Sequence, residues 1–136
     1  MAYGRLAYIG KVITSHTMTN KTILMTPDNI CMICSDIKPT ANISAGGTVF
    51  TLPDASLYPD NPVTILVPLY SSSNPTTNYY RILTVGTDGK VTTRTSISTS
   101  YTILSNGMMW HINDNFYNDT IGNNNMSNMT SPINYE

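Results

Sequence analysis

The chain has 136 residues and a formal net charge of -1; apolar residues make up 40% and charged residues only 11%. This length suffices for one domain with a buried core, and recurring Val, Ile, Leu and Tyr exclude a disordered chain, which is poor in apolar residues. The seven basic residues are scattered, which argues against nucleic-acid binding, because that requires clustered Lys or Arg.

Short strands separated by turns are predicted along the chain, over residues 5–13, 22–25, 30–35, 42–44, 48–52 and 63–70. Turn sequences lie between them, such as Pro27-Asp28-Asn29 and Ala45-Gly46-Gly47, and the prolines within residues 53–62 predict a rigid loop that no helix could cross. Abundant Thr, Tyr, Ile and Val, with a single Glu, favour strands over helices. We expect an all-β, antiparallel, jelly-roll-like sandwich.

Residues 63–70 form the most strongly predicted strand, and both of its faces are apolar. Val63, Ile65, Val67 and Leu69 alternate on one face, and Leu66, Pro68 and Tyr70 occupy the other. A strand that is apolar on both faces is buried on both. In a small antiparallel domain, we expect a neighbouring subunit to cover the second face.

Two hairpins are predicted at Asp88-Gly89 and Asn106-Gly107, dipeptides that supply the positive φ angles of a two-residue type I′ turn. In the second hairpin, Ile103 pairs with Trp110, which places Trp110 in the core and leaves His111 facing outward. In the first, neither face is cleanly apolar, which suits a sheet that touches both a core and a neighbour. The predicted subunit interface consists of Leu66, Pro68, Tyr70, Leu83 and Val85.

No catalytic constellation is predicted. His16 and His111 stand alone in separate segments without a nucleophile motif, and most Asp residues belong to turns. Cys31 and Cys34 form a C-x-x-C pair, but on a strand these positions point to opposite faces. We interpret both as small apolar residues and expect no enzyme activity, metal or cofactor.

The surface predicted from this composition suits neutral polar ligands. Sugar sites combine aromatic rings with planar hydrogen-bonding groups, and His111, Asn113, Asp114 and Tyr117 supply both in one strand and the loop that leaves it. The alternative is that His111 is a surface or inter-subunit histidine without a ligand. We expect residues 28–117 to form the sandwich, after an arm at 1–27 and before an irregular, Asn-rich tail at 118–136.

Residues 30–112 resemble the C-terminal head domain of phage receptor-binding and tail-fibre proteins. The glycine turn Asn42-Ile-Ser-Ala-Gly-Gly47 precedes the strand Thr48-Val-Phe-Thr-Leu-Pro53, and Pro59 comes shortly before the long apolar strand. The hairpin Gly86-Thr-Asp-Gly-Lys-Val91 then leads to a closing hairpin with Tyr101. The order of these elements carries the resemblance.

The resemblance implies a homotrimer of jelly rolls at the virion surface, which binds host-cell saccharides at or near subunit boundaries. It also implies release by lysis, which agrees with a first segment that lacks the features of a signal peptide. Such heads use Trp, His, Asp and Arg for sugar, which here points to Trp110, His111, Asp114 and Arg94. No membrane insertion is expected, since the longest apolar run, residues 63–69, is far shorter than the roughly 20 residues of a membrane span.

A second interpretation is a capsid head-fibre or decoration protein whose main partners are other virion proteins. Family members carry a shoulder and a long neck before the head, whereas about 27 residues precede the match here, without heptads or a Gly-x-y repeat. In this interpretation residues 1–27 anchor the chain to a virion protein. A third interpretation, a free carbohydrate-binding module, is weaker.

Overall fold

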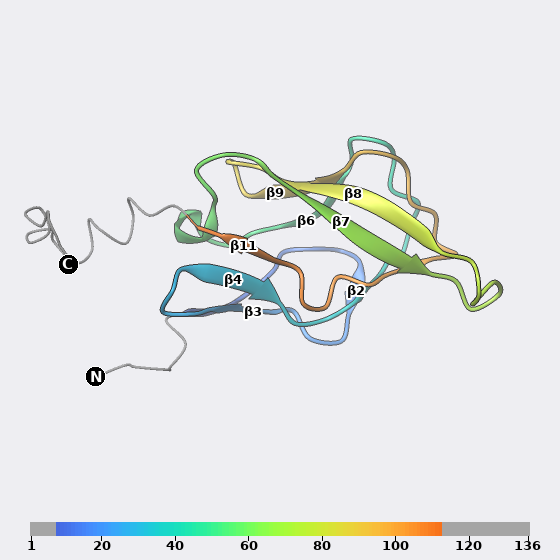
Figure 1. Cartoon of the computed structure of the whole chain (residues 1–136), viewed down its shortest axis with the longest axis horizontal. Coiled ribbons are helices and arrows are strands. Elements are labelled where there is room, and N and C mark those ends of the chain that lie inside the picture. The colour runs from blue at the N-terminus through green and yellow to red at the C-terminus, as the bar shows by residue number, and fades with distance from the viewer. Residues whose placement is uncertain (1–7, 113–136) are drawn as a thin grey trace, which may run out of the picture.

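The computed structural model describes residues 8–112, and their strands form two antiparallel sheets (Figure 1). The four-stranded sheet has the order β1 (Tyr8–Lys11), β3 (Thr22–Met25), β4 (Ile30–Ile33), β11 (Met109–His111). The seven-stranded sheet has the order β2 (Thr17–Met18), β5 (Ile37–Lys38), β10 (Thr102–Ile103), β7 (Val63–Tyr70), β8 (Tyr79–Val85), β9 (Lys90–Thr93), β6 (Thr48–Thr51).

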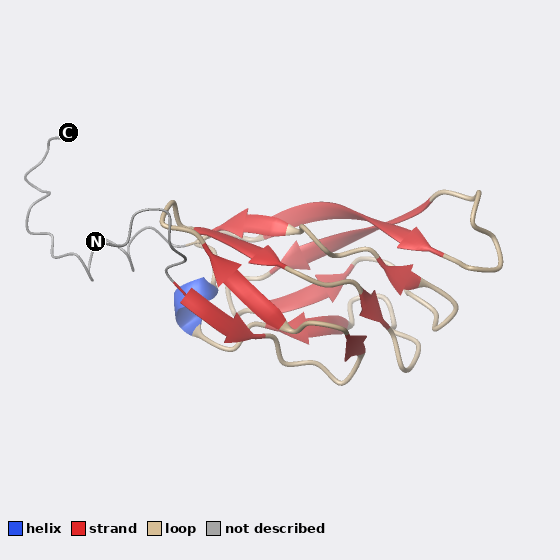
Figure 2. Ribbon diagram, turned by 90° about the horizontal axis from the view of Figure 1, so that it is seen from below, coloured by secondary structure: helices blue, strands red, loops and turns tan. Residues whose placement is uncertain are grey.

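The larger sheet curls into a half-barrel, and the described residues contain no α-helix. Figure 2 shows the strands in layers, with the one short 3-10 helix, Ala55–Leu57, at one end of them. The prediction of an all-β antiparallel chain is confirmed. It follows from the composition, because residues that suit a pleated surface dominate and good helix formers are few.

Alternate side chains of each strand fill one core between the sheets. In β4, Cys31 and Ile33 are fully buried while Ile30 and Met32 are partly exposed, as the two-residue period of a strand requires. Each fully buried large apolar side chain contributes about 1.5–3 kcal/mol. The largest of these side chains are Phe50, Ile23, Ile33, Ile37, Leu52, Leu57, Leu83, Ile97 and Ile103.

The hairpin predicted at Asp88-Gly89 is present, but its register differs by one residue from the prediction. Val85 pairs with Val91 and Leu83 with Thr93. The reason is the loop length: Gly89 N–H donates to Gly86 C=O (3.0 Å), and only Gly89 has a positive φ, 84°. Three residues therefore connect the strands, as in a type I turn followed by a residue in the left-handed conformation.

The hairpin predicted at Asn106-Gly107 is wrong. Here Ile103 pairs with Ile37 and Leu69 in the larger sheet, whereas Trp110 pairs with Cys31 in the smaller one. Gly107 has a φ of 94°, and Met108 N–H donates to Ser105 C=O (2.9 Å). A positive φ at the third turn residue alone fits a type II turn, and this turn carries the chain from one sheet to the other.

The separate arm predicted for residues 1–27 also needs correction within the described residues. β1 and β3 pair with each other, and β3 pairs with β4, so they form three of the four strands of the smaller sheet. β2 extends the larger sheet by pairing with β5. Residues 8–27 therefore belong to the folded body, because their apolar alternation contributes Ile23 and Met25 to the core.

Candidate functional site

The outer face of the larger sheet is apolar where β7, β8 and β10 meet. On β7 the inward side chains Val67 and Leu69 are buried, whereas Leu66 is 63% and Tyr70 43% exposed. Pro68 is exposed between them. The period of the strand requires this division, because the two faces alternate. The exposed face of β7 is the one that the sequence predicted to need a second cover.

Neighbouring strands extend this apolar face. Leu66 lies opposite Ile82 and Pro68 opposite Tyr80 on β8, and on the other side Leu104 N–H donates to Pro68 C=O (2.9 Å). We define the outer patch as the side chains of Leu66, Pro68, Tyr70, Tyr80, Ile82, Leu104 and Met109. Contiguous exposed apolar surface of this kind marks interaction sites in soluble proteins.

Two residues predicted for the subunit interface do not lie on this face. Leu83 and Val85 are fully buried inside the chain, because they pair with Ile65 and Val63 on the inward side of β7. Because successive side chains of a strand point to opposite faces, Tyr80, Ile82 and Thr84 lie on the outward side of β8 instead. The sequence could have identified Tyr80 and Ile82 once the register with β7 was fixed.

A groove of about 300 Å³ runs beside β7. Its walls come from Leu66 and Pro68 on β7 and from Leu104, Met108 and Met109 on the segment that crosses between the sheets. Met109 is the first residue of β11, which pairs with β4 in the smaller sheet. The groove therefore lies between a strand of the larger sheet and the edge of the smaller one, and apolar side chains dominate its lining.

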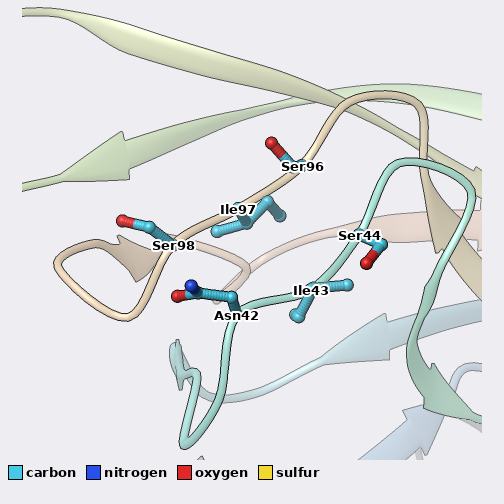
Figure 3. A pocket seen from close by; sticks show the side chains of 6 residues that line it. All are labelled: Asn42, Ile43, Ser44, Ser96, Ile97 and Ser98. Atoms are coloured by element: carbon cyan, nitrogen blue, oxygen red, sulfur yellow. The ribbon is translucent and has the colours of Figure 1, made fainter.

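A second, smaller hollow of about 140 Å³ is lined mainly by polar residues (Figure 3). Its floor is the isolated bridge between Ile43 and Ile97, which exchange two backbone hydrogen bonds of 2.8 Å. Asn42, Ser44, Ser96 and Ser98 complete the lining. It offers hydroxyl and amide groups, but no lining side chain is aromatic, so a sugar ring would find no stacking partner there.

The predicted ligand residues fall into two groups. His111 is exposed on β11 in the smaller sheet. Arg94 is exposed at the end of β9, and its N–H donates to Ile82 C=O (2.9 Å) beside the outer patch. These two residues lie on different sheets. The other three, Asn113, Asp114 and Tyr117, lie outside the described residues, so the complete site stays a prediction.

Trp110 is 3% exposed, and its indole Nε1 donates to Leu57 C=O (3.0 Å). The expected core position is therefore correct, although the pairing that places it there is with Cys31 and not with Ile103. A buried indole with a satisfied N–H cannot stack on a sugar without leaving the core. This position removes Trp110 from the ligand residues that the resemblance implies.

The two cysteines and His16 are also candidate chemical groups. Cys31 is buried, and burial raises the pKa of its thiol to about 12, whereas Cys34 follows the end of β4 and is partly exposed. Burial lowers the pKa of His16, whose Nδ1 accepts from Thr40 N–H (3.0 Å). Within residues 8–112 no three His, Cys, Asp or Glu side chains are grouped to hold a metal ion.

Comparisons with family models, curated proteins and solved structures found no match to this chain. Among the described residues no helix is long and apolar enough to cross a membrane.

Proposed function

We propose that this chain is a non-catalytic virion-surface protein of a phage, a homotrimeric jelly-roll fibre or receptor-binding head that attaches to host-cell glycans. The observation that carries the proposal is the outer patch. It covers the outward side of β7 and β8 and extends to Leu104, which follows β10, and to Met109 on β11; its members Leu66 and Tyr80 are 63% and 49% exposed. The resemblance in sequence to phage fibre heads supplies the biological setting.

Burial of the outer patch by a neighbouring subunit accounts for its composition. Burial of apolar area stabilises an assembly by about 25 cal/mol for each Å² removed from water. A monomer with this face in solvent would associate non-specifically. The outer face of β7 carries no charged side chain that a subunit contact would have to desolvate. These properties favour a specific subunit contact over a free monomer.

Glycan attachment is the second part of the proposal. Arg94 lies one strand away from the outer patch, in the row that runs from Leu66 through Ile82. It would therefore stand at the rim of a subunit contact, where charged groups remain hydrated. His111, with Asn113, Asp114 and Tyr117, would add the planar and aromatic groups that bind sugars, and the polar hollow is a further surface for hydroxyl groups.

The alternative function is a capsid head-fibre or decoration protein whose main role is to bind other virion proteins. The observation that favours it is the position of β1, which among the described strands pairs only with β3 and so forms one edge of the smaller sheet. An edge strand presents unpaired backbone groups to which another chain can add. The N-terminal part would then be the attachment point to the capsid.

The mass of the full chain in solution tests the assembly. A trimer is expected, and Leu66→Asp should shift it toward monomer, because a carboxylate would be buried in the contact. Ile13→Asp is the matched control: Ile13 is 59% exposed, close to Leu66, but lies off the outer patch. A wild-type monomer, or equal effects of both substitutions, would contradict the proposed contact.

A glycan array tests attachment. The wild-type chain is expected to bind a subset of bacterial surface saccharides, and His111→Ala, Asp114→Ala and Arg94→Ala should each weaken that binding. Retention of full affinity by all three variants would show that the sugar binds elsewhere. A chain that binds no saccharide but binds purified capsids would favour the decoration function.

A further inference from the structure

Strand β7 has an unpaired edge over its first half. On that side β10 pairs only Thr102 with Tyr70 and Ile103 with Leu69, and the last contact is from Leu104 N–H to Pro68 C=O (2.9 Å). The chain then turns away at Ser105 toward the other sheet. Within residues 8–112, positions 63–67 of β7 therefore have a strand partner, β8, on one side only.

The register shows which backbone groups face the open side. Ile82 C=O accepts from Arg94 N–H, so the backbone of Ile82 is directed toward β9. Its partner Leu66 must then direct its own N–H and C=O away from β8, because antiparallel pairs alternate between bonded and non-bonded positions. Thr64 has the same parity. Both residues present a donor and an acceptor to the open edge, and Leu66 also lines the groove.

The groove beside this edge suits one extended chain. Its apolar walls are formed by Leu66 and Pro68 on one side and by Leu104, Met108 and Met109 on the other. Met109 belongs to β11, which pairs with β4. A strand that entered here would place alternate side chains against these walls while its backbone bonded to Thr64 and Leu66, which is the geometry of strand addition.

This edge also lacks the usual protection. Natural sheet edges are blunted by charged side chains, prolines or bulges. The open residues of β7 carry no charge, and Pro68 stands only at the point where pairing with β10 resumes. An uncharged open edge on the longest strand of the larger sheet indicates a surface that another segment covers.

We propose that residues 113–136 of a neighbouring copy lie in this groove and add a strand to the β7 edge at Thr64 and Leu66. The inference rests on the proposed homo-oligomer and names the contact that would join its subunits. Ile112 N–H donates to Asn29 C=O in the turn between β3 and β4, so the last described residue is held at that turn and is not among the groove-lining residues.

Length, residue type and charge support this occupant. The 24 residues after Ile112 can span up to about 80 Å when extended, enough to reach a neighbour. They include Phe-Tyr-Asn-Asp-Thr-Ile at 116–121, a run with strand-favouring residues and no Gly or Pro. They carry three acidic and no basic side chains, whereas residues 8–112 carry six basic and five acidic ones, so the two parts attract weakly.

A proline at position 64 tests the added strand in the full chain. Thr64→Pro removes the N–H that faces the groove but leaves the β7–β8 hydrogen bonds intact, whereas Thr64→Ala shortens the same side chain and keeps the N–H. Thr64→Pro is expected to raise the dissociation constant of the oligomer at least tenfold, and Thr64→Ala to leave it within twofold. Equal dissociation constants for the two variants would overturn the proposal.

Disulfide trapping identifies the occupant and does not depend on the proline variant folding. Copies with Leu66→Cys are mixed with copies that carry Tyr117→Cys or Ile121→Cys, all in a Cys34→Ser background, and oxidised. A disulfide-linked dimer between positions 66 and 117 or 121 is expected. The absence of a cross-link between the mixed copies, also when a double variant with both cysteines in one chain forms the disulfide within that chain, would overturn the proposal.

These outcomes are separable from failure of the proposed function. A wild-type monomer would contradict the homo-oligomer itself. A wild-type trimer that keeps its mass with Thr64→Pro and forms no cross-link would retain the homo-oligomer and refute the strand addition.

Discussion

At Gly89, both the backbone conformation and the packing of a neighbouring ring require the absence of a side chain. Its φ of 84° closes the β8–β9 loop, and its C=O accepts from Leu52 N–H (2.8 Å). A Cβ atom at this position would overlap the ring of Tyr58, whose Cζ would be 2.5 Å away. Glycine is therefore required here both for the left-handed conformation and for the close approach of an aromatic ring.

Gly89→Ala is expected to lower the free energy of unfolding by about 3 kcal/mol, the sum of a left-handed alanine, about 1 kcal/mol, and overpacking against Tyr58, about 2 kcal/mol. Gly46→Ala is the control: Gly46 has a φ of 80°, but nothing lies within 4 Å of its added Cβ, so only the conformational part, about 1 kcal/mol, should be lost. Urea unfolding measures both. Equal losses would show that the Tyr58 ring moves aside freely.

At the scale of elements, strand positions were predictable and strand partners were not. The alternation over residues 63–70 depends on neighbouring residues alone, so the buried and exposed faces of β7 follow from the sequence. The loop at Asp88-Gly89 was also located, but one extra loop residue shifted the register. A one-residue shift exchanges the side chains of β9 that share a face with a given residue of β8. The predicted register therefore gave Leu83 and Val85 the wrong partners on β9, and they were assigned to the wrong side of the sheet.

Partner choice is decided by contacts distant in sequence. The Asn106-Gly107 dipeptide favours a tight turn in either a hairpin or a crossover. Here Ser105, which is buried and donates to Ser35 C=O (2.6 Å), holds the turn against the β4–β5 connection, and β10 and β11 separate into different sheets. The groove beside β7 results from this separation, so the sequence alone could not reveal it.

The β2–β5 pair depends on a histidine whose protonation should weaken it. His16 Nδ1 accepts from Thr40 N–H (3.0 Å), which joins the residue before β2 to the loop after β5. Protonation replaces this acceptor by a donor, and burial lowers the pKa of His16. The unfolded chain therefore takes up the proton first, and the stabilisation is complete above the unfolded pKa and is lost as pH falls through the folded one.

Urea unfolding between about pH 7.5 and about pH 5 measures this loss, since histidine titrates within that range. The wild-type midpoint should fall with pH more steeply than that of His16→Gln, whose side-chain amide does not titrate. Parallel pH profiles for the two proteins would show that the His16–Thr40 contact contributes nothing to the pH dependence.

For the whole molecule, the sparse charge determines how it can associate. Only 11% of the residues are charged and the net charge is -1, so long-range electrostatic attraction contributes little. The outer patch and the groove beside β7 are instead apolar surfaces that meet along one strand. Both proposed contacts would then be driven by removal of apolar area from water.

Salt dependence of the assembly follows from this. At about 1 M salt the Debye length falls to about 3 Å, which screens exposed ion pairs, but burial of Leu66, Pro68 and Tyr80 is not weakened by screening. The oligomer is therefore expected to keep its dissociation constant within about threefold, or roughly 0.7 kcal/mol, between low and high NaCl, as sedimentation velocity would measure. Dissociation at high salt would show that exposed charges such as Arg94 and Lys90 hold the subunits together, and would place the subunit contact at β9 instead of β7.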